Sequence, residues 1–167
     1  SAEVLWYLDS RGIPVPARAP LIRTPEPRDF PGAVFDADRV DRTLSALRHL
    51  RHTKGRWAGR PLELAPVQVA YLVAPVFGWV APNEQGRLTR IIRDLWWETP
   101  RKSGKTTVVA AIAMILAFAD GEPGAEVILG AAARDQTSAA FKPLAALVKA
   151  SPMLQQAGVR ALRGEIL

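Results

Sequence analysis

The residues with the clearest chemistry are Gly104, Lys105 and Thr106, which match the end of the phosphate-binding pattern G-x-x-x-x-G-K-[ST]. A glycine at this place lets backbone N–H groups come close to a phosphate. The lysine then reaches the outer phosphates of a nucleotide, and the threonine hydroxyl joins the shell of a magnesium ion. The pattern predicts a phosphate site with Lys105 as a catalytic residue and Thr106 as a metal ligand. The backbone amides of 102–105 and the side chain of Thr107 are expected to hold the remaining oxygens.

The start of the loop departs from the pattern, because Thr99 stands where the first glycine is expected and Pro100 follows it. These two residues still shape a tight turn, with less backbone freedom than glycine. Arg101 is expected near the outermost phosphate, where a guanidinium stabilises charge during phosphoryl transfer or senses the phosphate. Arg101 is therefore a second catalytic candidate, unless it pairs with Glu98 and only braces the loop. The side chain of Lys102 is expected to face solvent or DNA phosphates.

A phosphate loop needs a strand before it and a helix after it, so that the helix N-terminus points at the phosphates. Residues 88–98 are rich in β-branched and aromatic residues and predict a strand, and 105–119 predict a helix. After the turn signals of 120–124, the apolar run 125–132 is typical of a buried parallel strand, and a helix is predicted over 133–152. The order strand, loop, helix, strand, helix predicts an α/β fold with a P-loop NTPase-type parallel sheet and flanking helices.

The chain upstream of the loop is Pro-rich at first and then helical. Prolines crowd residues 11–32 and predict an extended segment or a linker. A second helix is predicted to begin at Pro66, to be bent or ended by Pro75 and to be closed by Gly78. The first helix is capped by Asp36 or Asp38, and its apolar residues share one face at helical spacing: Val40, Leu44, Leu47 and Leu50.

The composition is basic, with a net charge of +6 and a pI near 10.3. Such a surplus favours a polyanionic partner such as DNA, RNA or nucleotide phosphates. The stretch 48–61 gathers five lysines and arginines around Trp57, and it either grips a nucleic-acid backbone or is a solvated helix end and turn. His49 and His52 lack the partners of a metal site. The sequence has no cysteine and no apolar run long enough to span a membrane, so the cytosol is the expected compartment.

In the loop and on both sides of it, the chain resembles the N-terminal ATPase domain of the large terminase subunit of tailed bacteriophages. In that family the loop commonly reads Arg-Lys-Asn/Ser-Gly-Lys-Ser/Thr without the first glycine, as 101–106 does here. The segment 54–79 is similar to the family's upstream passage, and Gln68 matches the glutamine whose amide reads adenine. Val67 stands where the family usually has tryptophan. Downstream, 118–141 resembles the family's helix-to-strand-to-helix passage.

This resemblance implies a motor that uses ATP and Mg²⁺ to package viral DNA into the procapsid. The implied partners are double-stranded DNA, the portal ring, the small terminase subunit and further copies of the chain in a ring, with no membrane contact. The implied location is the procapsid portal in the host cell cytoplasm. Residues 1–35 are then a Pro-rich extended segment, and 36–167 are the N-terminal part of a P-loop ATPase domain with its nucleotide-binding core at about 60–150. The expected nucleotide-binding residues are these: Gln68, Arg101, Lys102, Ser103, Gly104, Lys105, Thr106 and Thr107.

An acidic pair after a later apolar strand completes such an ATPase, because the aspartate holds Mg²⁺ and the glutamate orients the attacking water. No apolar run after Lys105 is followed by Asp-Glu. In the terminase family this Walker B strand, the coupling motif, an arginine supplied to a neighbouring subunit and the nuclease domain lie further along. The chain is therefore expected to be a portion truncated before that strand, which alone binds nucleotide weakly, if at all, and does not hydrolyse it.

Two other interpretations stay open from the sequence. Another P-loop NTPase, helicase-like or kinase-like, would share the loop, and a helicase would also share the glutamine before it. A non-enzymatic basic binding module is the third possibility, in which Ser103 simply caps a helix. In that case the substitution of Lys105 would change no ligand affinity.

Overall fold

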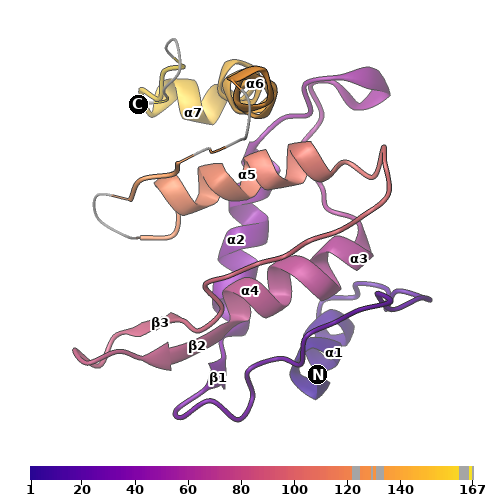
Figure 1. Ribbon diagram of the computed structural model, residues 1–167, viewed down its shortest axis with the longest axis vertical. Helices are drawn as coiled ribbons and strands as arrows, with labels where there is room; N and C mark the ends of the chain where they lie inside the picture. The colour runs from indigo at the N-terminus through magenta and orange to yellow at the C-terminus, as the bar shows by residue number, and fades with distance from the viewer. Residues whose placement is uncertain (122–124, 129, 131–133, 162–165, 167) are drawn as a thin grey trace. The chain divides into compact units, whose positions relative to one another are not determined.

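The chain separates into two compact units, each built from two stretches of the sequence. The first unit joins residues 1–44 to 64–97, and the second joins 45–63 to 98–167. The computed structural model describes these parts of the chain (Figure 1): residues 1–121, 125–128, 130, 134–161 and 166.

The first unit combines helices with a small antiparallel sheet. Its elements in chain order are as follows: α1 (Ala2–Ser10), β1 (Val34–Phe35), the first part of α2 (Ala37–His49), α3 (Pro66–Gln68), a π-helical segment (Val69–Val73), α4 (Ala74–Gly78), β2 (Trp79–Pro82) and β3 (Leu88–Arg90). The strand order is β1-β2-β3, and β2 pairs antiparallel with both neighbours. Val80 of β2 lies opposite Val34 on one side and Arg90 on the other.

Aromatic rings form the centre of the first unit. The ring of Phe35 meets two others edge-on, with ring centres 6.1 Å from Tyr7 and 5.6 Å from Trp79. A Cβ at Gly78 would collide with the Phe35 ring, so glycine is needed for the end of α4 to approach β1. The indole N–H of Trp79 donates to Glu26 over 2.6 Å, which links the Pro-rich segment to β2.

The prediction that residues 1–35 are extended was wrong for the first ten residues, because α1 forms there. Ser1 caps this helix by accepting a hydrogen bond from the Val4 amide at 3.3 Å. Val4, Tyr7 and Leu8 are buried at helical spacing, and this burial stabilises α1. Residues 11–33 contain no helix or strand, as their prolines predict.

An ion pair joins the end of α1 to α2 within the first unit. Asp41 accepts from Arg11 Nη2 at 2.7 Å and from Arg11 Nε at 3.1 Å, and the Tyr7 hydroxyl donates to the same carboxylate at 2.7 Å. The hydrogen bonds from Arg11, and then that from Tyr7, hold the pKa of the Asp41 carboxyl below its ordinary value despite some burial.

The predicted start and face of α2 are confirmed. Asp36 Oδ1 accepts from the Arg39 amide at 2.8 Å and so caps the helix. The predicted apolar face is buried at three of its four positions, and Leu44 is half-buried: Val40, Leu47 and Leu50.

The predicted second helix is also present, and it passes through Pro75 before it ends at Gly78. Proline lacks an N–H, and its ring clashes with the carbonyl four residues earlier in an α-helix. The residues from Val69 to Val73 are π-helical. This wider turn precedes the proline and allows the helix to continue.

The second unit is helical in its described part. Its elements are the following: the end of α2, a 3-10 turn (Gly55–Trp57), α5 (Lys105–Phe118), α6 (Arg134–Ala150) and α7 (Pro152–Gln156). The helix predicted over 105–119 is therefore confirmed as α5, which packs against α6, and α6 contacts α7. Alanines at positions 110, 111 and 113 of α5 are buried, and such small side chains allow a neighbouring helix to approach closely. Within the described ranges, none of the helices combines the length and apolar content that crossing a bilayer would require.

The strand predicted over 88–98 is present only at its start. β3 has three residues, and 92–100 contain no strand. A short turn explains why β3 pairs with β2, because Asn83 Oδ1 accepts from the amides of Gln85 and Arg87, both at 3.0 Å. An antiparallel pair forms through such a turn, whereas a parallel pair needs a crossover of a dozen or more residues.

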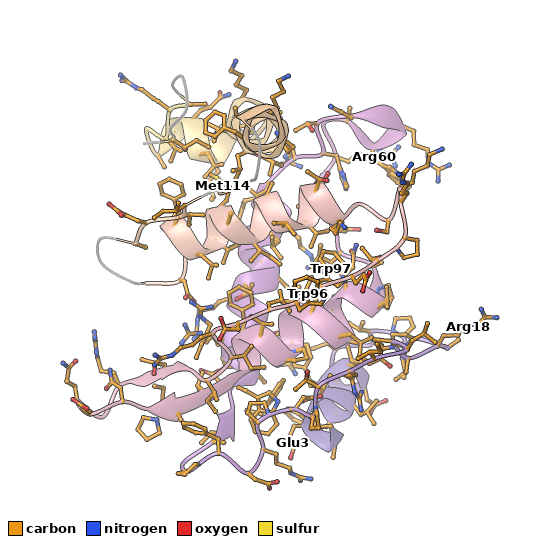
Figure 2. All side chains as sticks on the ribbon, in the orientation of Figure 1. Glu3, Arg18, Arg60, Trp96, Trp97 and Met114 are labelled. Carbon is orange, nitrogen blue, oxygen red and sulfur yellow. The ribbon has the colours of Figure 1, made fainter. Side chains whose placement is uncertain are left out.

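The strand predicted over 125–132 is not seen in the described residues either. Residues 125–128 and 130 contain no strand, and the other positions lie outside the described part of the chain. Both predicted segments expose large apolar side chains, since Trp96 is 91% exposed and Ile128 is 86% exposed (Trp96 in Figure 2). The mixed helix-and-sheet class is confirmed, but the named strands of the described residues pair only antiparallel, and the parallel sheet is not formed among them.

Candidate phosphate-binding site

The loop before α5 contains two residues with left-handed backbone. Lys102 has a φ of 67° and Gly104 has a φ of 81°. Glycine adopts this conformation freely, whereas other residues are destabilised by about 1–2 kcal/mol. Lys102 is therefore strained, and such strain is often found at functional sites. The sequence carried no signal for this role, because lysine is not typical of left-handed positions as asparagine or glycine is.

The N-terminus of α5 opens onto the loop. Gly104 occupies the cap position, and no side chain caps the helix. The first N–H groups of an α-helix lack acceptors within the helix, and the helix dipole makes this end positive. The loop and the first turn of α5, residues 99–107, surround a cavity of about 400 Å³. This arrangement suits an anion such as a phosphate.

The alternative that Ser103 simply caps the helix is contradicted by this geometry. The cap position belongs to Gly104, whose left-handed backbone turns the chain into α5. Apart from its two chain neighbours, no described residue has an atom within 4 Å of the place where a Cβ at Gly104 would stand, so a ligand can approach the backbone from that side. Ser103 is half-buried and lines the cavity.

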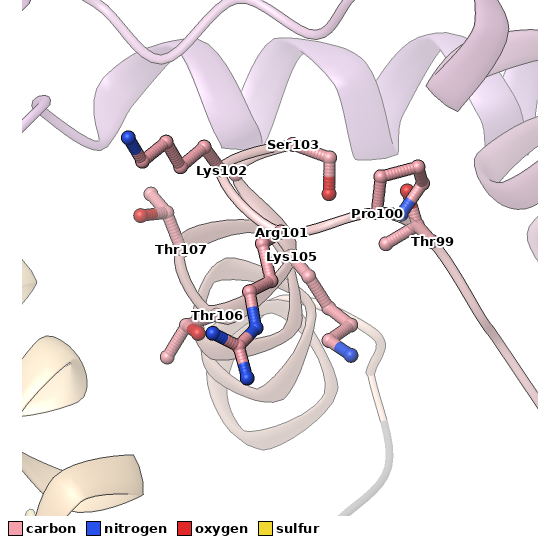
Figure 3. Close-up of a pocket in the computed structure, with 9 residues that line it drawn as sticks. Thr99, Pro100, Arg101, Lys102, Ser103, Lys105, Thr106 and Thr107 are labelled. Carbon is pink, nitrogen blue, oxygen red and sulfur yellow. The ribbon is translucent and has the colours of Figure 1, made fainter.

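Three exposed cations border the cavity: Arg101, Lys102 and Lys105. None of them forms an ion pair with another described residue, so the proposed brace between Arg101 and Glu98 is not formed. Arg101 and Lys105 extend to the same side of the loop, and Lys102 extends to the other side (Figure 3). Two charges therefore can act on one ligand, and the side chain of Lys102 extends away from both of them.

The hydroxyl groups of the first turn of α5 have different exposure. Thr106 is exposed, and Thr107 is half-buried. Among the described residues, no group of three or more histidine, aspartate or glutamate side chains is placed to hold a metal ion. Thr106 remains the predicted metal ligand of the loop.

Gln68 lies in the first unit, at the start of the helix that begins at Pro66. Its Oε1 accepts from the Ala65 amide at 2.9 Å, and this bond stabilises the first turn. The sequence reasoning missed this structural role, which the place of Gln68 three residues after the N-cap Ala65 could have indicated. The neighbouring Val67 is 46% exposed. The assignment of Gln68 to adenine stays a prediction.

A helix N-terminus without a side-chain cap, beside two cations on one side of the loop, is typical of proteins that bind phosphate groups. The family model described as terminase large subunit, ATPase domain, matches residues 66–161, which is more than half of the chain. The chain therefore belongs to the family of terminase large subunit ATPase domains, as its resemblance indicated. No curated protein and no solved structure matches it significantly.

Proposed function

We propose that the loop at 99–107 binds the phosphates of ATP and that this domain hydrolyses ATP to drive viral DNA into the procapsid. The observation that carries the proposal is the N-terminus of α5, which has no side-chain cap and opens onto the cavity behind Gly104. Membership of the terminase ATPase family supports ATP as the ligand. A phosphate placed there is stabilised both by backbone N–H groups and by the helix dipole.

Two side chains supply the positive charge of the proposed site. Lys105 contacts the outer phosphates, and Arg101 stabilises the charge that develops on the transferred group. Their common direction supports the proposal that both act on one ligand (Figure 3). Lys102 contributes its backbone N–H, and the hydroxyls of Ser103 and Thr107 hold further oxygens.

Mg²⁺ is proposed to bind beside the nucleotide, with Thr106 as its protein ligand in the loop. Magnesium usually keeps several waters and takes phosphate oxygens of the nucleotide as ligands. A single exposed hydroxyl at the start of α5 therefore fits such an ion. The ion neutralises charge on the phosphates when it is bound.

The parallel sheet of a P-loop NTPase is proposed to form from the segments on either side of α5. Residues 92–98 and 125–128 each carry large apolar side chains, and neither segment has a strand partner in the described part of the chain. The exposure of Trp96 and Ile128 supports this proposal, because large apolar side chains in such segments are normally covered.

The partners and the location follow from the same family membership. We propose that the domain acts on double-stranded DNA as part of a ring of identical chains, beside the portal ring and with the small terminase subunit. The proposed location is the procapsid portal in the host cell cytoplasm. A nuclease activity, where present, belongs to parts of the protein other than this loop.

The experiment that tests the nucleotide site is equilibrium binding of a fluorescent ATP analogue with Mg²⁺. The chain is compared with Lys105→Ala and with Lys142→Ala, which removes the same charge from an exposed position on α6 in the same unit. We expect Lys105→Ala to weaken binding by about tenfold or more, because a charge-assisted contact to phosphate is lost. Lys142→Ala should bind like the unchanged chain.

Equal affinities of the folded chain and of Lys105→Ala would contradict the proposed site. Equal losses in both lysine variants would show that only net charge matters. Circular dichroism spectra of the three proteins establish that each is folded before the affinities are compared.

A further inference from the structure

The basic stretch between the two predicted helices forms a defined hairpin, which we call the basic hairpin (residues 50–62). Its two arms are joined by backbone hydrogen bonds from Leu62 N to Leu50 O at 2.9 Å and from His52 N to Arg60 O at 2.9 Å. A further bond runs from Gly59 N to His52 O at 2.8 Å, and the 3-10 turn Gly55–Trp57 forms the tip. The element is therefore a built structure and not a frayed helix end.

The base of the basic hairpin is anchored in the second unit. Leu50 and Leu62 are each 2% exposed, so the two arms start from buried positions. The amide of Arg51 donates to the hydroxyl of Ser151 at 3.0 Å, and Ser151 is completely buried. A fixed base and an exposed tip place the side chains of the tip in solvent.

The charge of the basic hairpin is of one sign. Arg48 precedes it, and its own cations are Arg51, Lys54, Arg56 and Arg60. No acid occurs in the sequence between Asp41 and Glu63. No ion pair joins these cations to any other described residue. Unpaired cations on one projection produce a local positive potential that attracts a polyanion.

Trp57 holds two of these cations at the tip. The guanidinium carbons of Arg56 and Arg60 lie 5.0 Å and 5.3 Å from the centre of its ring, and the indole is 46% exposed (Arg60 in Figure 2). Stacking on an aromatic ring restricts a guanidinium but leaves its N–H groups free to form hydrogen bonds. The rotamer entropy that arginine loses on binding is thereby partly lost before the ligand arrives.

We propose that the basic hairpin is a sequence-independent contact for the sugar-phosphate backbone of duplex DNA. Two guanidiniums beside one ring are close enough to take neighbouring phosphates, which planar arginine forks bind in a bidentate manner. The indole is already approached by two cations, and this favours phosphate contacts over the stacking of bases on its ring. The choice of DNA among polyanions rests on the proposed function, whereas the site itself rests on the geometry of the hairpin.

The test is fluorescence anisotropy of a labelled 30-base-pair DNA duplex with the chain, without nucleotide and at several salt concentrations. The main variant is Arg56→Ala with Arg60→Ala, and the matched control is Lys142→Ala with Lys149→Ala, which removes equal charge from exposed positions of α6. We expect the arginine variant to bind about tenfold more weakly and its log–log salt slope to fall by about two. The control should change affinity by about twofold or less.

Two further variants separate the effect of charge from the effect of the ordering of the two guanidiniums by Trp57. Trp57→Ala leaves the net charge unchanged, and we expect it to weaken DNA binding by about threefold because the two guanidiniums lose their support. Trp57→Phe keeps an aromatic ring and should restore most of the affinity. Arg56→Gln with Arg60→Gln provides a second test if the alanine variant does not fold, since glutamine keeps the stems of the side chains.

Several outcomes would overturn the inference. Equal losses in the arginine variant and in the α6 control would mean that only net charge attracts DNA. A larger loss for the matching single strand than for the duplex would mean that bases stack on Trp57. Weaker binding of the fluorescent ATP analogue by the arginine variant would place the hairpin at the nucleotide. If Lys105→Ala alone loses the nucleotide and the hairpin variants keep DNA affinity, the hairpin inference fails while the proposed function stands. If Lys105→Ala keeps its nucleotide affinity and the hairpin variants lose DNA affinity, the nucleotide site is contradicted while the hairpin inference stands.

Discussion

The loop at 99–107 and the basic hairpin both gather cations in the second unit, but they present charge in different ways. The loop offers backbone N–H groups at the start of α5, with Arg101 and Lys105 to one side. The basic hairpin offers side chains, two of which are ordered by Trp57. Backbone groups at a helix end suit one compact phosphate cluster, whereas several separate side chains suit an extended polyanion. The two regions should therefore respond differently to salt and to substitution.

The largest predicted difference between the loop and the basic hairpin is in how strongly salt weakens ligand binding. Between about 50 and 200 mM salt, we expect DNA affinity to fall about 100-fold if four cations of the hairpin contact phosphates, because each contact releases condensed counterions. Binding of the fluorescent ATP analogue should fall by less than about tenfold, because a nucleotide carries no condensed counterion layer. Titration of both ligands over the same salt series measures the two slopes. Parallel slopes would remove the distinction between the regions.

Substitution of Gly104 should damage the loop alone. A β-branched side chain is strained at a φ of 81° and narrows access to the backbone, so we expect Gly104→Val to weaken nucleotide binding by about tenfold or more. DNA affinity should stay within about twofold, since the basic hairpin is untouched. The matched control is Gly130→Val, at a glycine without a positive φ. Equal effects of both substitutions on nucleotide binding would contradict a special role for Gly104.

Substitution of Lys102 tests whether this residue acts through its backbone. Lys102→Gly should keep nucleotide affinity within about threefold, because its left-handed conformation suits glycine and its side chain extends away from Arg101 and Lys105. Lys102→Val should lower the free energy of unfolding by about 1 kcal/mol or more. Chemical denaturation and nucleotide titration of both variants measure the two effects. A large affinity loss in Lys102→Gly would show that the ammonium group binds the ligand.

The smallest predicted effect lies in the first unit, where Asp41 binds Arg11 and Tyr7 and belongs to neither proposed ligand site. Because the pKa of Asp41 is lowered in the fold, its stabilisation is present above the ordinary pKa of the carboxyl and is lost as the pH falls through the lowered value. Asp41→Asn should lower the free energy of unfolding by about 1 kcal/mol at neutral pH, a modest value because the pair is partly exposed. Asp29→Asn, in an exposed loop, is the control. Denaturation at pH 7 and over a descending pH series should show that the difference shrinks once the pH is below the ordinary pKa of an aspartate.

The spacing of Gly104, Lys105 and Thr106 predicted the loop and α5 because the chemistry of that site is local in sequence. The cap and apolar face of α2 and the start of the next helix at Pro66 were predicted for the same reason. The left-handed backbone of Lys102 was not predictable, because it depends on the whole turn and not on the residue type. The pairing of Trp57 with two arginines needed the hairpin geometry, although the composition of the stretch had indicated a polyanion site.

The sheet was the weakest part of the sequence prediction. Residues 88–98 have strand composition, but strand pairing depends on neighbours that composition does not identify. The turn at Asn83 places β3 beside β2, and the turn signal of Asn83 and Gly86 was not used to predict it. α1 was missed because the following prolines dominated the interpretation of the N-terminal segment.

The most direct test of the central claim is the response of backbone amides of the isotopically labelled chain to ADP with Mg²⁺, measured by NMR. If the start of α5 holds the phosphates, the amide resonances of Gly104, Lys105 and Thr106 should shift strongly with ADP and remain unchanged with adenosine. The amides of the basic hairpin should stay unchanged with both ligands. Shifts confined to residues outside 99–107, with the loop amides unaffected by ADP, would contradict a phosphate site at the N-terminus of α5.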